Sequence, residues 1–175
     1  MHPIAHAQAR PDHPAIIMAA SGETVSYRQL DETANRFAHL LRSRGIGAGG
    51  HFGLLMENNA LYLQLVWGSQ RSGAMMVPIS TRLTAPEIAY ILRDCDAKLL
   101  VTSTYFADRI EALRALCPEC EFLVLDGEGE EDLAKALADQ PDAPLSDPVP
   151  GQYMLYSSGT TGRPKGVRPR APDSD

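Results

Sequence analysis

Short apolar runs alternate with helix-like segments along most of the chain. Strand-like runs occur at residues 52–56, 74–78, 99–101 and 122–125. Apolar residues at helical spacing occur at 30–41, 61–67, 88–92, 106–116 and 133–137. A helix between two strands returns the chain to the same end of the sheet, so successive strands run parallel with right-handed crossovers. The sequence therefore predicts an α/β fold with a doubly wound, largely parallel sheet and helices on both faces.

Local signals predict where several of these elements begin. The residues that follow Ser26 and Thr84 have the spacing of a capping box, which marks the start of a helix. Asn58 or Asn59 is suited to cap the next helix, because its side-chain oxygen can accept from the first free backbone N–H groups. The strand-like runs 15–18 and 23–26 flank residues 19–22, which predicts a β-hairpin near the N-terminus.

Composition excludes several classes of function. The chain has 175 residues, 44% of them hydrophobic and 22% charged, which is ordinary for one globular domain. Its net charge of −6 argues against a nucleic-acid partner, which needs a basic surface. The N-terminus lacks the pattern of a signal peptide and no apolar run is long enough for a transmembrane segment, so we expect a cytoplasmic protein.

The three cysteines favour a structural role. Cys95, Cys117 and Cys120 are an odd number in a chain without export signals, so we expect reduced thiols. A structural zinc site needs four ligands, and a redox pair should open a helix, whereas Cys117 and Cys120 close one. We therefore predict no metal site in the chain.

One polar stretch is hard to explain as ordinary structure. Residues 157–166 hold four hydroxyl side chains, three glycines and one lysine, directly after the strand-like run 153–156. Glycines let backbone N–H groups approach an anion, hydroxyls add donors, and a lysine adds a mobile positive charge. The stretch therefore predicts a loop that binds a polyphosphate.

The order of residues in this loop indicates a family. It is not a Walker A loop, because Pro164 and Gly166 stand where that pattern needs Gly and Ser or Thr. The run Ser-Ser-Gly-Thr-Thr-Gly-Arg-Pro-Lys-Gly resembles the phosphate-binding signature of the adenylate-forming superfamily, which includes acyl-CoA synthetases, peptide-synthetase adenylation domains and luciferases. A second block, at 72–92, resembles the same family in the right order, with Ser80 departing from the usual Asn or Asp.

The resemblance implies an activity and a set of contacts. It implies an AMP-forming acyl-CoA ligase that uses ATP, Mg²⁺ and CoA to activate a small-molecule carboxylate, specifically a fatty acid, through an acyl-adenylate. The residues it implies at the β- and γ-phosphates are Ser157, Ser158, Gly159, Thr160, Thr161, Gly162 and Lys165. Pro164 would fix the path of the loop and Gly166 its exit, and the resemblance assigns no catalytic residue in this chain.

The resemblance also predicts an organisation. We expect an N-terminal α/β subdomain at 1–138, a proline-rich connector at 139–151, the strand and phosphate loop at 152–167, and a frayed tail at 168–175. The family's adenine, magnesium, ribose and C-terminal lysine motifs are not found in the sequence. The chain is therefore expected to be an incomplete N-terminal portion that is not catalytically competent alone, with a complementing chain as a possible partner.

Two other functions compete with this interpretation. A non-catalytic α/β fragment with weak nucleotide binding remains the alternative. The glycines at 45, 47 and 50 match the G-x-G-x-x-G pattern of NAD-binding proteins, but they follow a helix and precede a strand, which is the reverse of what that site requires. The acidic run at 128–132 and the scattered histidines are typical of solvated surface.

Overall fold

The computed structural model describes residues 3–158 and 164–168 of the chain. The helices are α1 (Pro3–Ala9), α2 (Tyr27–Ser43), α3 (Ala60–Ser72), α4 (Ala85–Asp94), α5 (Ala107–Leu116) and α6 (Leu133–Ala138), with short 3-10 helices η1 (Thr104–Phe106) and η2 (Gly129–Glu131). The strands are β1 (Pro14–Ile17), β2 (Thr24–Ser26), β3 (His51–Leu54), β4 (Met75–Pro78), β5 (Leu99–Ser103), β6 (Glu121–Leu125), β7 (Gln152–Tyr153), β8 (Leu155–Ser158) and β9 (Pro164–Val167).

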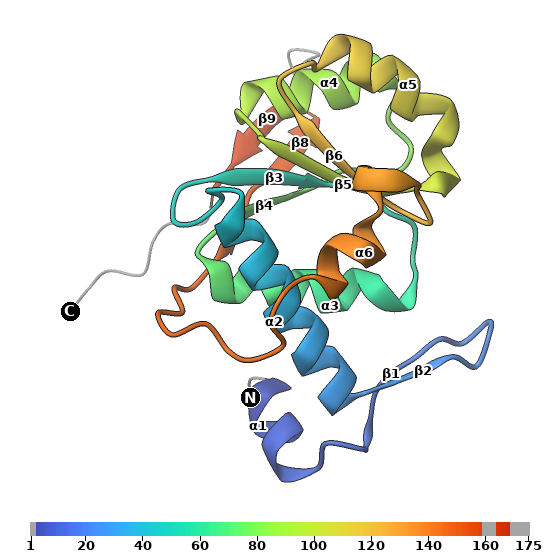
Figure 1. Ribbon diagram of the computed structural model, residues 1–175. Coiled ribbons are helices and arrows are strands. Elements are labelled where there is room, and N and C mark those ends of the chain that lie inside the picture. The colour runs from blue at the N-terminus through green and yellow to red at the C-terminus, as the bar shows by residue number, and fades with distance from the viewer. Residues whose placement is uncertain (1–2, 159–163, 169–175) are drawn as a thin grey trace.

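Five strands form a central parallel sheet in the order β6-β5-β3-β4-β7. The chain moves from β3 to β4 on one side, and then crosses to β5 and β6 on the other. Helices α4 and α5 cover one face of the sheet, while α2, α3 and α6 cover the opposite face (Figure 1). The predicted doubly wound α/β fold is confirmed.

Side chains of the central strands alternate between two cores. On β5, Leu100 packs in the core beneath α4 and α5, whereas Leu99 and Val101 pack in the core beneath α2 and α6. On β6, Phe122 and Leu123 divide in the same way. Because successive residues of a strand point to opposite faces, a strand covered on both sides must be apolar at nearly every position. This explains the continuous apolar runs in the sequence.

The predicted helix starts are confirmed in atomic detail. Ser26 accepts a hydrogen bond from the backbone N–H of Gln29 at 3.2 Å, and the Gln29 side chain accepts from the Ser26 backbone N–H at 2.8 Å. Asn59, rather than Asn58, caps α3. The predicted hairpin is present as the antiparallel pair β1–β2.

Two local predictions differ from the structure. Helix α1 was not predicted, because it is short and buries no residue; it is held partly by the His6 ring, which lies 4.9 Å from that of Tyr27. The predicted strand 153–156 is interrupted at Met154, so that β7 joins the central sheet while β8 pairs with β9 in a separate hairpin. Met154 marks the change, with its N–H donating to the Met76 carbonyl at 2.9 Å.

The proline-rich connector, residues 139–151, runs back across α2 and α3. Arg36 donates to the carbonyl of Gln140 at 2.7 Å, and Arg42 to that of Asp147 at 3.1 Å. These arginines lie on α2 and fix a segment that has no regular structure of its own. The connector then leads directly into β7.

Helices α2 and α3 cross closely at Gly68. A Cβ atom at this position would lie 2.7 Å from the backbone carbonyl oxygen of Ala34 and 2.9 Å from the Cβ of Phe37. Backbone atoms cannot move aside as the end of a flexible side chain can. The glycine therefore sets the distance between the two helices.

We predict that Gly68→Ala lowers the free energy of unfolding by about 1 kcal/mol, and by at most about 2 kcal/mol. The higher helix propensity of alanine contributes about 1 kcal/mol in favour of the variant, but forcing a methyl into this crossing costs about 1–3 kcal/mol. Urea unfolding of the chain measures the difference. Gly47→Ala is the matched control, because its Cβ would meet the flexible Arg42 side chain at an ordinary 3.4 Å; a Gly68→Ala variant as stable as this control would contradict the prediction.

Candidate functional site

The β8–β9 hairpin carries both ends of the predicted phosphate loop. Its antiparallel register pairs Ser157 with Lys165 and Tyr156 with Gly166. Residues directly opposite each other in such a pair project from the same face of the ribbon. Ser157 and Lys165 therefore share one face, and both are exposed.

The structure places the predicted phosphate contacts only in part. It brings Ser157 and Lys165 together across the hairpin. The backbone of Ser158 lies in β8 opposite Pro164, while the position of its side chain is not described. The remaining predicted contacts lie outside the described residues: Gly159, Thr160, Thr161 and Gly162. Their role stays a prediction.

Lys165 has the properties of a cation ready for an anionic ligand. It is exposed, and it has no ion-pair partner within residues 3–158 and 164–168. An ammonium group without an internal partner can give its full charge to a phosphate. The Ser157 hydroxyl adds a donor on the same face.

The other face of the hairpin is attached to the body of the protein. The Tyr156 ring packs against the core beneath α4 and α5, and its hydroxyl donates to Asp94 Oδ2 at 2.5 Å. Burial, followed by this hydrogen bond, raises the pKa of the Tyr156 hydroxyl well above its ordinary value, so the group stays a donor at neutral pH. Gly166 lies opposite, where a Cβ would be 3.2 Å from the Tyr156 Cζ and would collide with the end of Met154.

A second contact joins the hairpin to the sheet just after β9. The guanidinium of Arg168 lies 3.1 Å from His51 Nε2, at the start of β3. Burial, and then the charge of Arg168, lower the pKa of the His51 imidazole, so that the ring is neutral at pH 7 and can accept this hydrogen bond. Of the predicted tail 168–175, Arg168 alone is among the described residues.

The other candidate motifs are placed as structural features. Gly45, the first residue of the G-x-G-x-x-G match, follows α2 and adopts φ 71°, as a helix end requires. All three cysteines are free and buried, and burial raises the pKa of Cys95 to about 11 and that of Cys120 to about 12. Thiols with such pKa values are poor nucleophiles at neutral pH. Among the described residues, no three His, Cys, Asp or Glu side chains are grouped to hold a metal ion.

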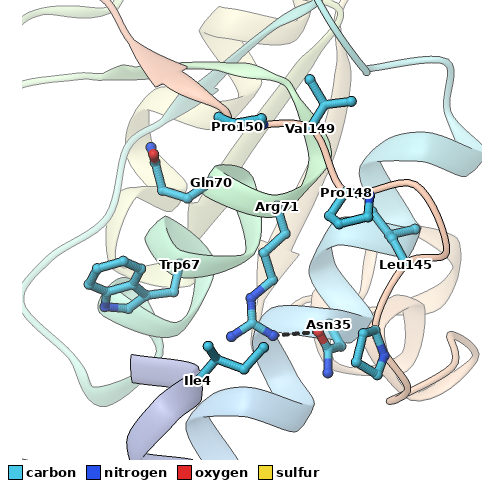
Figure 2. A pocket seen from close by; sticks show the side chains of 10 residues that line it. Ile4, Asn35, Trp67, Gln70, Arg71, Leu145, Pro148, Val149 and Pro150 are labelled. Atoms are coloured by element: carbon cyan, nitrogen blue, oxygen red, sulfur yellow. Dashed lines mark hydrogen bonds between the residues drawn. The ribbon is translucent and has the colours of Figure 1, made fainter. Parts of the chain in front are cut away.

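A cavity of about 420 Å³ lies away from this hairpin, between α1, α2, α3 and the connector. Figure 2 shows Trp67, Gln70 and Arg71 on its α3 side, with connector residues opposite. Its walls are formed by Ile4, Asn35, Trp67, Gln70, Arg71, Pro144, Leu145, Pro148, Val149 and Pro150. Sequence reasoning missed it, because no local pattern shows that segments so far apart in the chain meet.

The positive charge at this cavity is already compensated. Arg71 donates to Asp31 Oδ1 at 2.6 Å and to the Asn35 side-chain oxygen (Figure 2). The side chains of Arg71 and Asp31 are only 8% and 21% exposed. The charges of this buried pair neutralise each other, and Arg71 Nε is enclosed with no hydrogen-bond partner in the described part of the chain. The Lys165 ammonium is therefore more available to an anionic ligand than the Arg71 guanidinium.

Comparison with known proteins gives a consistent result. The chain matches the family described as AMP-binding enzyme over residues 4–168. It is 35% identical over 170 residues to the fatty acid–acyl-carrier-protein ligase ScoC of Streptomyces coeruleorubidus, and the aligned region covers 93% of this chain and 31% of ScoC. It is 36% identical over 157 residues to the long-chain-fatty-acid–CoA ligase FadD13 of Mycobacterium tuberculosis, and here the aligned region covers 87% of this chain and 31% of FadD13. The chain thus spans about a third of the length of these relatives.

Solved structures show the same fold. The inhibitor-bound N-terminal domain of FACL13 from Mycobacterium tuberculosis superposes with a TM-score of 0.84 at 31% identity, over 95% of this chain and 42% of that one. The anthranilate CoA ligase AuaEII, in complex with anthranoyl-AMP, gives a TM-score of 0.82 at 28% identity, over 95% of this chain and 32% of AuaEII. None of the helices in the described part of the chain has the length and hydrophobicity that crossing a membrane requires.

The buried ion pair beside the cavity generates a prediction. Asp31→Ala leaves the Arg71 charge buried without its partner, so we expect it to lower the free energy of unfolding by about 3 kcal/mol. The control is Asp12→Ala, which removes the partner of Arg28 from a pair that is 52% and 83% exposed. Loss of such a surface pair should cost less than about 1 kcal/mol. Equal losses in the two variants, measured by urea unfolding, would show that the Asp31–Arg71 pair is not effectively buried.

Proposed function

The chain belongs to the AMP-binding enzyme family, and from this premise we propose that it provides the phosphate-binding part of an ATP-dependent ligase. That ligase would activate a fatty acid to an acyl-adenylate and then to an acyl-CoA. The observation that supports the proposal is the shared exposed face of Ser157 and Lys165, at the two ends of the predicted loop. The family and the α/β fold are consistent with it.

The chemistry explains why such a face is useful. In adenylation, a carboxylate attacks the α-phosphorus of ATP and pyrophosphate leaves, so negative charge increases on the leaving group. An enzyme must hold the triphosphate still and place donors where that charge develops. The Lys165 ammonium, which has no ion-pair partner among the described residues, and the Ser157 hydroxyl can do this for the β- and γ-phosphates. We propose that Ser158, Gly159, Thr160, Thr161 and Gly162 add the remaining contacts.

The acid and the acceptor are proposed from the relatives. ScoC and FadD13 are both named as fatty-acid ligases, and FadD13 and AuaEII as CoA ligases. The chain also aligns with bacitracin synthase 1 of Bacillus licheniformis, at 32% identity over 161 residues, covering 92% of this chain and 3% of the synthase. We favour a fatty acid because ScoC and FadD13 both carry that word in their names, and CoA because FadD13 and AuaEII are named as CoA ligases, whereas ScoC is named for an acyl-carrier-protein acceptor. Mg²⁺ is proposed with ligands in the remainder of the ligase, outside this chain.

The surface beside the hairpin supports a role as part of a larger assembly. Tyr153, Leu155 and Val167 are 47%, 48% and 54% exposed. Leu155 and Val167 are cross-strand partners on the same face as Ser157 and Lys165. Large apolar side chains gathered on one surface indicate a contact with further polypeptide. We propose that the remainder of the ligase, in the same or a complementing chain, packs there.

We predict that Lys165→Ala weakens ATP binding about tenfold, because a hydrogen bond to a charged group contributes about 1.5–3 kcal/mol. Isothermal titration calorimetry on the purified chain measures the affinity. Lys135→Ala, an exposed lysine on α6, makes the same change in net charge and should leave the affinity unchanged. Equal weakening of ATP binding in both variants would mean that the effect comes from net charge alone. Unchanged ATP binding in both variants would show that Lys165 does not contact the nucleotide.

A second assay separates the ligase part from a non-catalytic α/β fragment. We predict that the chain alone binds ATP but supports no carboxylate-dependent exchange between ATP and pyrophosphate, and that a polypeptide supplying the rest of the family's domain restores exchange. Exchange by the chain alone would show that it already forms a complete adenylation site. Failure to bind ATP at all would favour the non-catalytic alternative.

A further inference from the structure

The β8–β9 hairpin is not part of the central sheet. It forms a separate two-stranded sheet, so ladder hydrogen bonds to β3–β7 do not fix its orientation. An isolated hairpin of two short strands is only marginally stable in water. The direction in which Ser157 and Lys165 point must therefore be set by other contacts between the hairpin and the body of the protein.

The Tyr156–Asp94 hydrogen bond is placed to set that direction. It joins β8 to the last residue of α4 across 62 positions of sequence. Helix α4 is itself a firm support, because Ile88, Ile91 and Leu92 are buried in the core and a capping box closes its N-terminus. Asp94 thus extends from the end of a well-supported helix, and its exposed carboxylate accepts the hydrogen bond that can orient the hairpin.

Strand geometry connects this contact to the candidate site. Tyr156 and Ser157 are neighbours on β8, so their side chains point to opposite faces. With Tyr156 directed inward to Asp94, Ser157 and its cross-strand partner Lys165 must point outward. Gly166 leaves room for the Tyr156 ring on the inner face. Rotation of the hairpin about its long axis would break the hydrogen bond and turn the outer face away.

We propose that Tyr156 is a positioning residue, whose hydrogen bond to Asp94 holds Ser157 and Lys165 in the orientation that meets the phosphates. The part that concerns phosphate rests on the proposed function. The competing explanation is that Tyr156 only fills space beneath the hairpin. The two differ in what the hydroxyl does, because phenylalanine would fill the same space without donating to Asp94.

The test is a double-mutant cycle with two readouts. The variants are Tyr156→Phe, Asp94→Ala, the double variant, and Asp94→Asn, which keeps an oxygen that can accept from Tyr156. ATP affinity is measured by calorimetry, and amide hydrogen exchange is followed in residues 155–158 and 165–167. A cycle isolates the pairwise interaction from the separate effects of each substitution.

We expect Tyr156→Phe and Asp94→Ala each to weaken ATP binding about tenfold, as loss of a hydrogen bond to a charged group predicts. The double variant should be no weaker than either, and Asp94→Asn should stay within about threefold of the wild type. Amide exchange in the hairpin should accelerate in the first three variants, while exchange in β3, at the centre of the sheet, stays slow.

Wild-type affinity and wild-type exchange in Tyr156→Phe would overturn the positioning role, as would additive losses in the double variant. A wild-type chain that binds no ATP would contradict the proposed function instead. In that case amide exchange decides the orientation part by itself: acceleration in Tyr156→Phe and Asp94→Ala, but not in Asp94→Asn, supports it, and unchanged exchange overturns it.

Discussion

The central sheet is covered by helices on both faces, and this burial determines where chemistry can occur. Strands β3 to β6 direct apolar side chains into two separate cores. Polar ligand-binding groups on those faces would lose their water without gaining a ligand, which is costly. Polar ligand-binding groups are therefore expected where the chain leaves the sheet. The departure at Met154, between β7 and β8, is where the hairpin with the phosphate-loop signature begins.

Within that hairpin, side chains alternate between two faces, so the face attached to the body of the protein is separate from the exposed face. The inner face holds Tyr156, which packs on the core and donates to Asp94. The outer face holds the Ser157–Lys165 pair. A hydroxyl beside an ammonium that has no ion-pair partner in the described part of the chain suits a phosphate, whereas Arg71, which lines the cavity of Figure 2, is already neutralised by Asp31.

The sequence predicted those features that depend on local patterns. Helical and strand periodicity indicated the α/β fold, and capping residues placed the starts of α2, α3 and α4, because such signals act within a few residues. It could not predict that the run 153–156 divides at Met154, since apolar residues suit either sheet. Nor could it predict the Tyr156–Asp94 contact, which depends on how α4 packs. The phosphate-loop signature named seven residues, of which the structure places the side chains of Ser157 and Lys165.

We propose that the β8–β9 hairpin, and not the cavity, receives a nucleotide phosphate. The measurement is a titration of the ¹⁵N-labelled chain with ATP, followed by amide and indole chemical shifts. We expect the largest shifts within residues 157–166, while the indole of Trp67 and the amides of the connector remain unchanged. Saturable shifts centred on Trp67 and the connector, with residues 157–166 unaffected, would contradict it and assign nucleotide binding to the cavity.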